Sequence, residues 1–479
     1  MGDAMGRLTR TASVGLLAML GACASLSGVP VPSSGRYITS AAARSGPLVV
    51  EQEELLLRPV LMRGTGVLQD PATDAYVGQV ARRLLAGWPT RVNIPVYLIP
   101  CDDFTAEGSA NGAVFLTTGV LQYVADHPDA ASEDFLAFII AHELSHVLLG
   151  HARDRAVQQE MLHRATAVMT FVSGIMARAK NAGIAKDAIT ASLGILMAVE
   201  VADGSFFPGM TREQEGQADT LAIDLMGKAG YSVDAVPKVM AVLEAQDAVA
   251  AQRRQANRVE FLQPIQNGVS IQLGPYLAQM WKDQSVDHPL AADRDAAARL
   301  YIHREWDDQS VKLHQAEMAA YLRNKSVRQM LTDSQTETRA FILAGQGQSR
   351  AAAQLLLQVR SPAVRNSSMH LTTMTILATT IIPAKQFDGL VEHSLAQPYA
   401  TEPLFIFRAH QLETAGHPDQ ALRLHQVAYQ RFEDPNLFPE QIRLLHRLNR
   451  GTEAIVVAAK CYATGLNALQ QLCSEASKT

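Results

Sequence analysis

The pattern of hydrophobic and polar residues predicts a small mixed domain within the first 150 positions. Helical spacing runs through residues 73–85, and two short apolar runs, at 92–99 and 113–118, are typical of strands. A longer helix is expected over 132–150, because Ser132 is a good N-cap and two acidic residues follow it in the first turn. Helices combined with a few short strands indicate an α+β fold that is mainly α.

Two further apolar stretches follow, at residues 165–177 and 188–198. Each is shorter than the roughly 20 residues that a membrane-spanning helix needs. Two interpretations remain: a pair of buried helices, or an amphipathic pair that rests on a membrane surface.

The last third of the chain has a repeating helical pattern. Turn-like positions at Gly347, Ala384, Gly416 and Gly451 lie 32 to 37 residues apart, close to the roughly 34-residue period of tetratricopeptide helix hairpins. We therefore expect residues 311–479 to form a tetratricopeptide-like α-solenoid. A non-repetitive helical bundle is the alternative.

The chain begins like an exported protein. Two basic residues precede an apolar run at 12–20 that is too short to span a bilayer, and Leu-Gly-Ala-Cys follows, ending at Cys23. This string resembles a bacterial lipobox, which implies lipidation of Cys23, removal of residues 1–22 and, because Ala24 comes next, sorting to the outer membrane. An ordinary signal peptide is the alternative. Residues 23–50 are rich in Ser, Gly and Pro, the composition of a flexible linker from a lipid anchor.

Composition and charge narrow the function classes. A chain of 479 residues is expected to hold two or three domains, and 48% hydrophobic with 19% charged residues excludes a disordered or multi-span membrane protein. The formal net charge of −5 offers no general electrostatic footprint for nucleic acid, so nucleic-acid binding is not expected.

Cys461 and Cys473 are close in sequence and could form a disulfide in an oxidising compartment. Two buried thiols are the alternative.

The motif that carries chemistry lies inside the predicted helix 132–150, where His142, Glu143 and His146 form a His-Glu-x-x-His pattern. Four residues of helix turn through about 400°, so the two histidines share a face and can offer two nitrogens to one zinc ion. Glu143 sits beside them, where it can take a proton from an attacking water. A catalytic zinc normally has three protein ligands and one open position, so a third ligand is needed.

The third ligand is not expected to be a nearby histidine. Leu149 and Ala152 stand where a metzincin would have its Gly and its third His, which excludes that arrangement. His151 would lie about 140° round the helix from His146, so we expect it behind a ligand or at the surface.

A carboxylate is the remaining choice, and the segment 211–219 offers two. Glu215 and Asp219 are one helical turn apart, so Glu215 can bind zinc while Asp219 accepts the ring N–H of a motif histidine. Taken alone, the segment would be a solvated, charge-rich helix start. The His-Glu-x-x-His helix about seventy residues earlier favours the ligand interpretation instead.

These motifs together resemble a known family. The strings HELSH and TREQEGQAD, the segment 105–121 before the motif, and Asp287-His288-Pro289 with Arg294 are similar to those of the CAAX-prenyl-protease-like zinc peptidases. The lipobox-like start and the repeat-like end resemble the periplasmic branch of that family. The likeness covers about residues 60–300 closely and the repeats loosely.

The resemblance implies a zinc peptidase domain over residues 51–310 that binds one Zn²⁺ per chain. It also implies a role for each matching residue: zinc ligation by His142, His146 and Glu215, general base catalysis by Glu143, orientation of a ligand by Asp219, and oxyanion stabilisation by His288 and Arg294, with His288 alternatively capping the open position. Before the motif the chain departs from the family pattern at residues 105–106 and 110–112. It keeps the apolar run 113–118, so we expect a strand beside the cleft that binds peptide by β-addition.

For the whole chain, the resemblance implies a zinc-dependent endopeptidase of the bacterial periplasm, anchored by lipid to the inner leaflet of the outer membrane. Its substrates would be unfolded or misassembled envelope proteins, and the repeats would recruit them or the outer-membrane assembly machinery. The alternative is a chaperone or scaffold lipoprotein with a latent zinc site closed by His288. Glu143 argues against it, because a structural site has no use for a base at that position.

Overall fold

The computed structural model describes residues 36–46, 48, 50–151, 212–246, 291–308, 311–345, 348–381, 384–464 and 467–478. Several predicted features lie outside the described residues: the signal segment 1–22, Cys23, the apolar stretches 165–177 and 188–198, the turn position Gly347, and His288. Within the described part of the chain, every helix is too short or too polar to cross a lipid bilayer.

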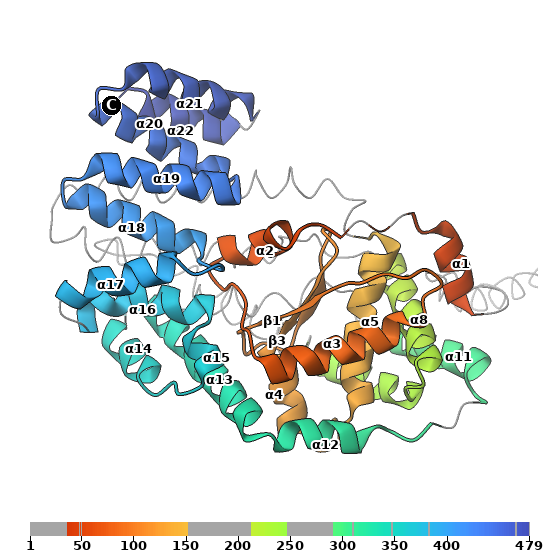
Figure 1. Ribbon diagram of the computed structural model, residues 1–479. Helices are drawn as coiled ribbons and strands as arrows, with labels where there is room; N and C mark the ends of the chain where they lie inside the picture. Colours follow the sequence, from red (N-terminus) through yellow and green to blue (C-terminus); the bar gives the residue numbers. More distant parts are fainter. Residues whose placement is uncertain are drawn as a thin grey trace, which may run out of the picture.

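The first half of the described chain contains a three-stranded sheet surrounded by helices (Figure 1). Its elements are α1 (Tyr37–Arg44), α2 (Glu53–Met62), α3 (Pro71–Leu85), β1 (Val96–Ile99), β2 (Ala106–Gly108), β3 (Val114–Thr117), α4 (Thr118–Asp126), α5 (Glu133–Leu149), α8 (Arg212–Lys228), η1 (Val233–Ala235) and α11 (Ala291–Glu305). A further helical stretch covers residues 236–246.

The second half is helical. Its elements are α12 (Gln315–Arg323), α13 (Lys325–Gly345), α14 (Ser349–Leu356), α15 (Pro362–Arg365), α16 (Ser368–Ile381), α17 (Ala384–Leu395), α18 (Glu402–Thr414), α19 (Pro418–Phe432), η3 (Pro435–Leu437), α20 (Phe438–Arg447), α21 (Gly451–Ala463) and α22 (Asn467–Ala476). The mainly α fold with a small sheet agrees with the prediction.

Helix α5, which carries the His-Glu-x-x-His motif, begins and ends where the sequence predicts. The Ser132 side chain accepts a hydrogen bond from the backbone N–H of Phe135 over 3.3 Å, which caps the first turn. Gly150 ends the helix with φ +72°, a conformation that glycine adopts without steric cost. The helix is buried along almost its whole length, so its motif side chains are held inside the domain.

The sheet has the order β1-β3-β2, with β1 parallel and β2 antiparallel to the central strand β3. The two apolar runs that predicted strands contain β1 and β3. The short strand β2 forms the edge of the sheet and packs against α5. The expectation that the apolar run 113–118 provides a strand for β-addition is therefore wrong, because β3 is paired on both sides and the edge strand beside the motif helix is β2.

Both faces of the sheet are buried, which explains why β3 is apolar at consecutive positions. Leu98 and Leu116 point into the core shared with α3 and α5. Phe115 points to the opposite face, into a second core that contains residues of α2, α13, α16, α18 and α19. The helical half therefore packs on the outer face of the sheet, with α2 in contact with α18 (Figure 1).

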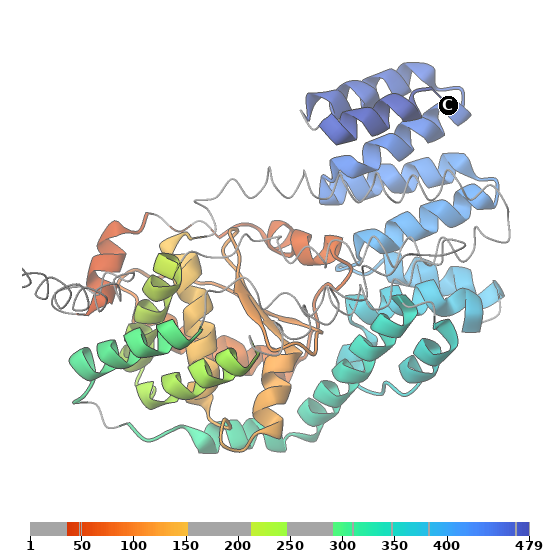
Figure 2. The ribbon, with the colours of Figure 1, turned by 180° about the vertical axis from the view of Figure 1, so that it is seen from behind.

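The helical half continues as successive packed pairs, α13 with α14, α16 with α17, α18 with α19, and α20 with α21. The second helix of three of these pairs begins at or near a predicted turn position, at Ala384, Pro418 and Gly451. The pairs extend away from the sheet in both views (Figure 1, Figure 2). A disulfide between Cys461 and Cys473 joins α21 to α22, so of the two alternatives for these cysteines the structure has the disulfide.

Helix α1 lies inside the segment 23–50 that was expected to be a flexible linker. Its residues Tyr37 and Ile38 are buried, and the backbone N–H of Ile38 donates a hydrogen bond to Oδ2 of Asp224 on α8 over 2.7 Å. Tyr301 and Trp306 donate to the other oxygen of the same carboxylate, over 2.8 and 2.9 Å. The buried Asp224 therefore docks the N-terminal helix on α8, which Ser, Gly and Pro content did not reveal.

Candidate metal centre

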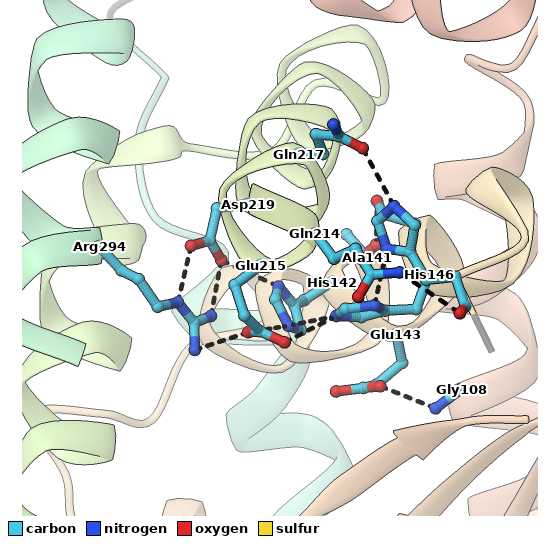
Figure 3. Close-up of polar contacts among 12 residues, drawn as sticks. Gly108, Ala141, His142, Glu143, His146, Gln214, Glu215, Gln217, Asp219 and Arg294 are labelled. Atoms are coloured by element: carbon cyan, nitrogen blue, oxygen red, sulfur yellow. Dashed lines mark hydrogen bonds and ion pairs between the residues drawn. The ribbon is translucent and has the colours of Figure 1, made fainter. Parts of the chain in front are cut away.

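His142 and His146 lie on one face of α5, as the four-residue spacing predicts. Their Nε2 atoms are 3.1 Å apart, and the two side chains are 6% and 1% exposed. Both rings point across the helix interface toward α8, which packs alongside α5 (Figure 3).

Helix α8 places Glu215 opposite the two imidazoles (Figure 3). Its Oε2 is 3.4 Å from Nε2 of His142, and its Oε1 is 3.5 Å from Nε2 of His146. Glu215 is fully buried, so the carboxylate lies inside the protein at the point where the two histidines converge. The structure therefore brings together the three residues that the sequence nominated as ligands.

The three donor groups fit a zinc ion in type and in spacing. Their ligand atoms all lie within 4.8 Å of one another, and two imidazoles with one carboxylate form a donor set that zinc accepts. Bonds of roughly 2.0–2.2 Å in a tetrahedron put neighbouring donors about 3.4 Å apart. The separations of 3.1, 3.4 and 3.5 Å are close to that value.

A buried ion-pair network lies behind these groups. Oδ1 of Asp219 is 2.9 Å from Nδ1 of His142, on the side of the ring that faces away from Glu215. Arg294 of α11 donates to both oxygens of Asp219 over 2.8 Å, and its Nη1 lies 2.9 Å from Oε2 of Glu215 (Figure 3). One guanidinium therefore balances two carboxylates, and its nitrogens point at these carboxylates.

The charges of this network shift the pKa values of its members. Burial raises the pKa of Asp219, but the Arg294 guanidinium and His142 outweigh it and hold that pKa below its usual value. Burial lowers the pKa of His142, but the hydrogen bond and the charge of Asp219 outweigh it and raise the pKa to about 10. Asp219 is therefore an anion that accepts the Nδ1–H of His142, which leaves Nε2 facing Glu215.

Glu143 points the other way, toward the edge of the sheet (Figure 3). Its Oε2 accepts a hydrogen bond from the backbone N–H of Gly108 on β2 over 2.7 Å. A Cβ at position 108 would lie 2.5 Å from the backbone oxygen of Glu143, so only glycine lets β2 come this close to α5. Gly108 was not among the predicted site residues, because its only signal in the sequence is its place shortly before an apolar strand.

A cavity of about 60 Å³ that opens to solvent adjoins Glu143 and His142. Arg294 also lines it. Its remaining wall is mostly apolar, with two polar residues among the nine that form it: Phe104, Thr105, Ala106, Val120, Phe138, Ile139, Val239, Leu243 and Gln246. The polar groups therefore stand at one side of an apolar cavity, the arrangement expected of a small binding site.

His151 lies behind His146, one of the two places that the sequence allowed. Its side chain is buried, and its Nδ1 is 3.0 Å from Nδ1 of His146. Gln217 of α8 reaches the far nitrogen of His151, and the sequence analysis did not single it out. Its spacing of two residues from Glu215 gave no helical signal, because residues two apart on a helix face different directions.

Comparison with known proteins gives a family match over most of the chain. The model of peptidase family M48 matches residues 104–429, a span that contains every described residue of the centre. A putative beta-barrel assembly-enhancing protease of Vibrio cholerae serotype O1 is 27% identical over 203 residues, 40% of this chain and 38% of that protein.

Two other relatives are similarly distant. The metalloprotease YcaL of Escherichia coli K12 is 28% identical over 143 residues, 30% of this chain and 47% of that protein. The beta-barrel assembly-enhancing protease of Yersinia pestis is 26% identical over 179 residues, 36% of this chain and 33% of that protein. The chain thus spans between about a third and a half of the length of these relatives.

Proposed function

The chain belongs to peptidase family M48 and is a metalloprotease, and from this premise we propose that it is a zinc-dependent endopeptidase of the bacterial periplasm. Its proposed substrates are misfolded or stalled envelope proteins. The observation that carries the proposal is the buried group His142, His146 and Glu215, with Glu143 beside it at the edge of an open cavity.

His142, His146 and Glu215 would hold one zinc ion per chain. When bound, zinc would act as a Lewis acid that lowers the pKa of the attacking water and polarises the carbonyl of the scissile peptide bond. Asp219 fixes the ring of His142 by accepting its Nδ1–H, and Arg294 keeps the two buried carboxylates oriented.

Glu143 is the general base and then the general acid. Its carboxylate takes a proton from the water that attacks the carbonyl carbon, and it returns that proton to the nitrogen when the C–N bond breaks. The products are a carboxylate and a free amine. The hydrogen bond from Gly108 holds the carboxylate at the sheet edge, where an extended peptide would lie.

The edge strand β2 supports the binding of an extended peptide. It is paired with β3 along one side, and an edge strand presents backbone N–H and C=O groups on the other. A substrate that adds to this edge would run past Glu143 and the apolar cavity. Unfolded proteins offer such extended apolar segments, which supports substrates of this class.

The cellular location is part of the proposal. The lipobox-like segment that ends at Cys23 supports a lipid anchor, with the protein on the inner leaflet of the outer membrane. The disulfide between Cys461 and Cys473 agrees with an oxidising compartment such as the periplasm. Relatives named beta-barrel assembly-enhancing proteases support a role in envelope protein quality control.

The helical half is proposed to be a tetratricopeptide-like solenoid that recruits substrates or the outer-membrane assembly machinery. Its successive helix pairs, and the 32 to 37 residues that separate the predicted turn positions, support this assignment. Because the helices share a core with the sheet, a recruited protein would be held next to the peptidase centre.

The proposal is tested with the purified full chain, by measuring zinc per chain and the cleavage of unfolded casein. We expect about one zinc per chain, and cleavage that is lost in Glu143→Gln while zinc is retained. Glu244→Gln, a matched change at an exposed position, should cleave like the wild type.

Other outcomes would overturn parts of the proposal. Absence of zinc would remove the ligand assignment, and cleavage that survives in Glu143→Gln would remove that residue from the mechanism. Zinc without cleavage in any variant would favour the alternative, a chaperone or scaffold lipoprotein with a latent site. His288→Ala would then test whether His288 closes the centre, since release of the cap should restore cleavage.

A further inference from the structure

The two histidines of the centre are oriented in different ways. His142 has a carboxylate behind it, since its Nδ1 lies 2.9 Å from Oδ1 of Asp219. His146 has another imidazole behind it, since its Nδ1 lies 3.0 Å from Nδ1 of His151. The His151 backbone N–H donates to the His146 backbone oxygen over 3.1 Å, which holds the second ring close to the first. His146 and His151 are both buried.

The hydrogen bonds beyond His151 determine which nitrogen carries each proton. Nε2 of Gln217 donates to Oε1 of Glu213 over 3.1 Å, so the other end of that amide is an acceptor. That acceptor, Oε1 of Gln217, lies 3.2 Å from Nε2 of His151, which must therefore carry the proton.

One further hydrogen bond links His151 to the centre. A neutral imidazole has one N–H, so Nδ1 of His151 is an acceptor and receives the Nδ1–H of His146. Nε2 of His146 then keeps a lone pair, as a metal ligand must. Each donor in this series meets an acceptor, and the series ends on a surface carboxylate.

We propose that His151 and Gln217 are positioning residues that fix the tautomer and the orientation of His146 for zinc binding. The proposal rests on the zinc centre of the proposed function. It also explains why the partner is an imidazole, because the centre already holds the carboxylates of Glu143, Glu215 and Asp219, with the guanidinium of Arg294 beside them. A neutral ring orients His146 without adding a fourth carboxylate to the centre.

The first test measures the affinity of the purified full chain for zinc alone, by competition with a chromophoric chelator. His151→Ala should bind zinc about 10- to 100-fold more weakly, the usual effect of losing a group that orients a ligand. His151→Gln should recover most of the affinity, because an amide oxygen can accept the Nδ1–H of His146. His127→Ala, a change at the exposed histidine that follows α4, is the matched control and should bind like the wild type.

The second test asks whether Gln217 acts through His151. Gln217→Leu should weaken zinc binding by a smaller factor than His151→Ala, and should cause no further loss in the His151→Ala background. Gln217 is only partly buried, so this variant remains informative if His151→Ala folds poorly. Urea unfolding of the zinc-free variants identifies any general loss of stability.

The outcomes separate this inference from the proposed function. Wild-type zinc affinity in both His151→Ala and Gln217→Leu would overturn the inference while leaving the zinc peptidase intact. If Gln217→Leu weakens zinc binding equally with and without His151, Gln217 does not act through His151, and the two residues make independent contacts. A wild-type chain that binds no zinc would overturn the proposed function instead.

Discussion

The backbone N–H of Gly108 donates to Oε2 of Glu143 over 2.7 Å, which joins the edge strand of the sheet to the proposed general base. The strand that is proposed to pair with substrate and the carboxylate that is proposed to move the proton are therefore held in one geometry. The contact requires glycine at position 108, because a Cβ there would lie 2.5 Å from the backbone oxygen of Glu143.

Gly108→Ala should therefore push β2 away from α5 and break this hydrogen bond. A displacement of about 1 Å in a catalytic site can cost roughly 100-fold in rate, so we expect casein cleavage to fall by 10- to 100-fold, roughly, while zinc is retained. Gly389→Ala is the control, since a Cβ at Gly389 would meet no atom within 4 Å. Equal activity of the two variants would show that the close approach of β2 is not required.

Arg294 lies buried between two carboxylates, so its removal should cost stability as well as metal affinity. Breaking a buried pair by deleting one partner typically costs about 3–5 kcal/mol, because uncompensated charge remains inside the protein. We expect Arg294→Met to lower the free energy of unfolding by about this amount in urea titrations. Arg294→Lys should lose less, since it keeps the charge but not the two-pronged contact.

The same helix offers a matched control for Arg294. Arg299 pairs with Asp295 over 2.7 Å, but its side chain is 57% exposed, and exposed pairs contribute little. Arg299→Met should leave the unfolding free energy within about 0.5 kcal/mol of the wild type. If both methionine variants lose the same small amount, the buried network does not stabilise the fold.

The centre was largely predictable because its signals are local. The spacing of His142 and His146 requires only a helix, and the helix was marked by Ser132 and Gly150 at its ends. Glu215 and Asp219 were found for the same reason, since four residues are one helical turn. Chemistry that depends on one helix face can be derived from the spacing of its residues.

The missed features depend on how distant elements pack. Gly108 contacts Glu143, and Gln217 contacts His151, only because the sheet edge and α8 lie against α5. No periodicity within one segment reports such a placement. The core that the sheet shares with the helical half was missed for the same reason. An apolar residue such as Phe115 is typical of any strand, and only the fold reveals that its neighbours come from the helical half. The sequence thus predicted the ligand residues of the centre better than the contacts between elements that hold them in place.

Asp434, which precedes η3, should make the stability of the helical half depend on pH. Burial raises its pKa from 3.8 to about 6, although hydrogen bonds from Asn436 oppose the shift. The folded chain therefore holds this proton more tightly than the unfolded chain does. Its stabilising contribution is complete below about pH 4 and is lost as the pH rises through about 6.

Asp434→Asn removes this titration and keeps an oxygen that can accept from Asn436. The unfolding free energy of the variant relative to the wild type should rise between pH 4 and pH 7, by up to about 3 kcal/mol. Urea titrations at several pH values measure the difference. Asp419→Asn, a change at an aspartate whose pKa is lowered by Arg423, should show no such rise. A flat difference for Asp434→Asn would mean that the pKa of this carboxyl group is the same in the folded chain as in the unfolded chain.

The apolar cavity beside Glu143 should select the residue that follows the scissile bond. Glu143 is proposed to protonate the leaving amine, and the side chain attached to that nitrogen would then face the cavity wall formed by Leu243 and Val239. We expect the wild type to prefer a large apolar residue at this position. The preference is measured as kcat/KM for peptides that differ only there, with Ala, Val, Leu, Phe or Asp.

Leu243→Phe should narrow the cavity and shift the preference toward Ala and Val. A difference of one or two methylenes in an apolar pocket changes the discrimination between two substrates by about 10- to 200-fold. The ratio of kcat/KM for the Leu peptide to kcat/KM for the Ala peptide should therefore fall at least 10-fold, roughly. Ala245→Phe introduces the same side chain on the same helical stretch, at an exposed position outside the cavity, and should leave the ratio unchanged. An unchanged ratio in Leu243→Phe would mean that the cavity holds a different part of the substrate, because a filled specificity pocket cannot keep its selectivity.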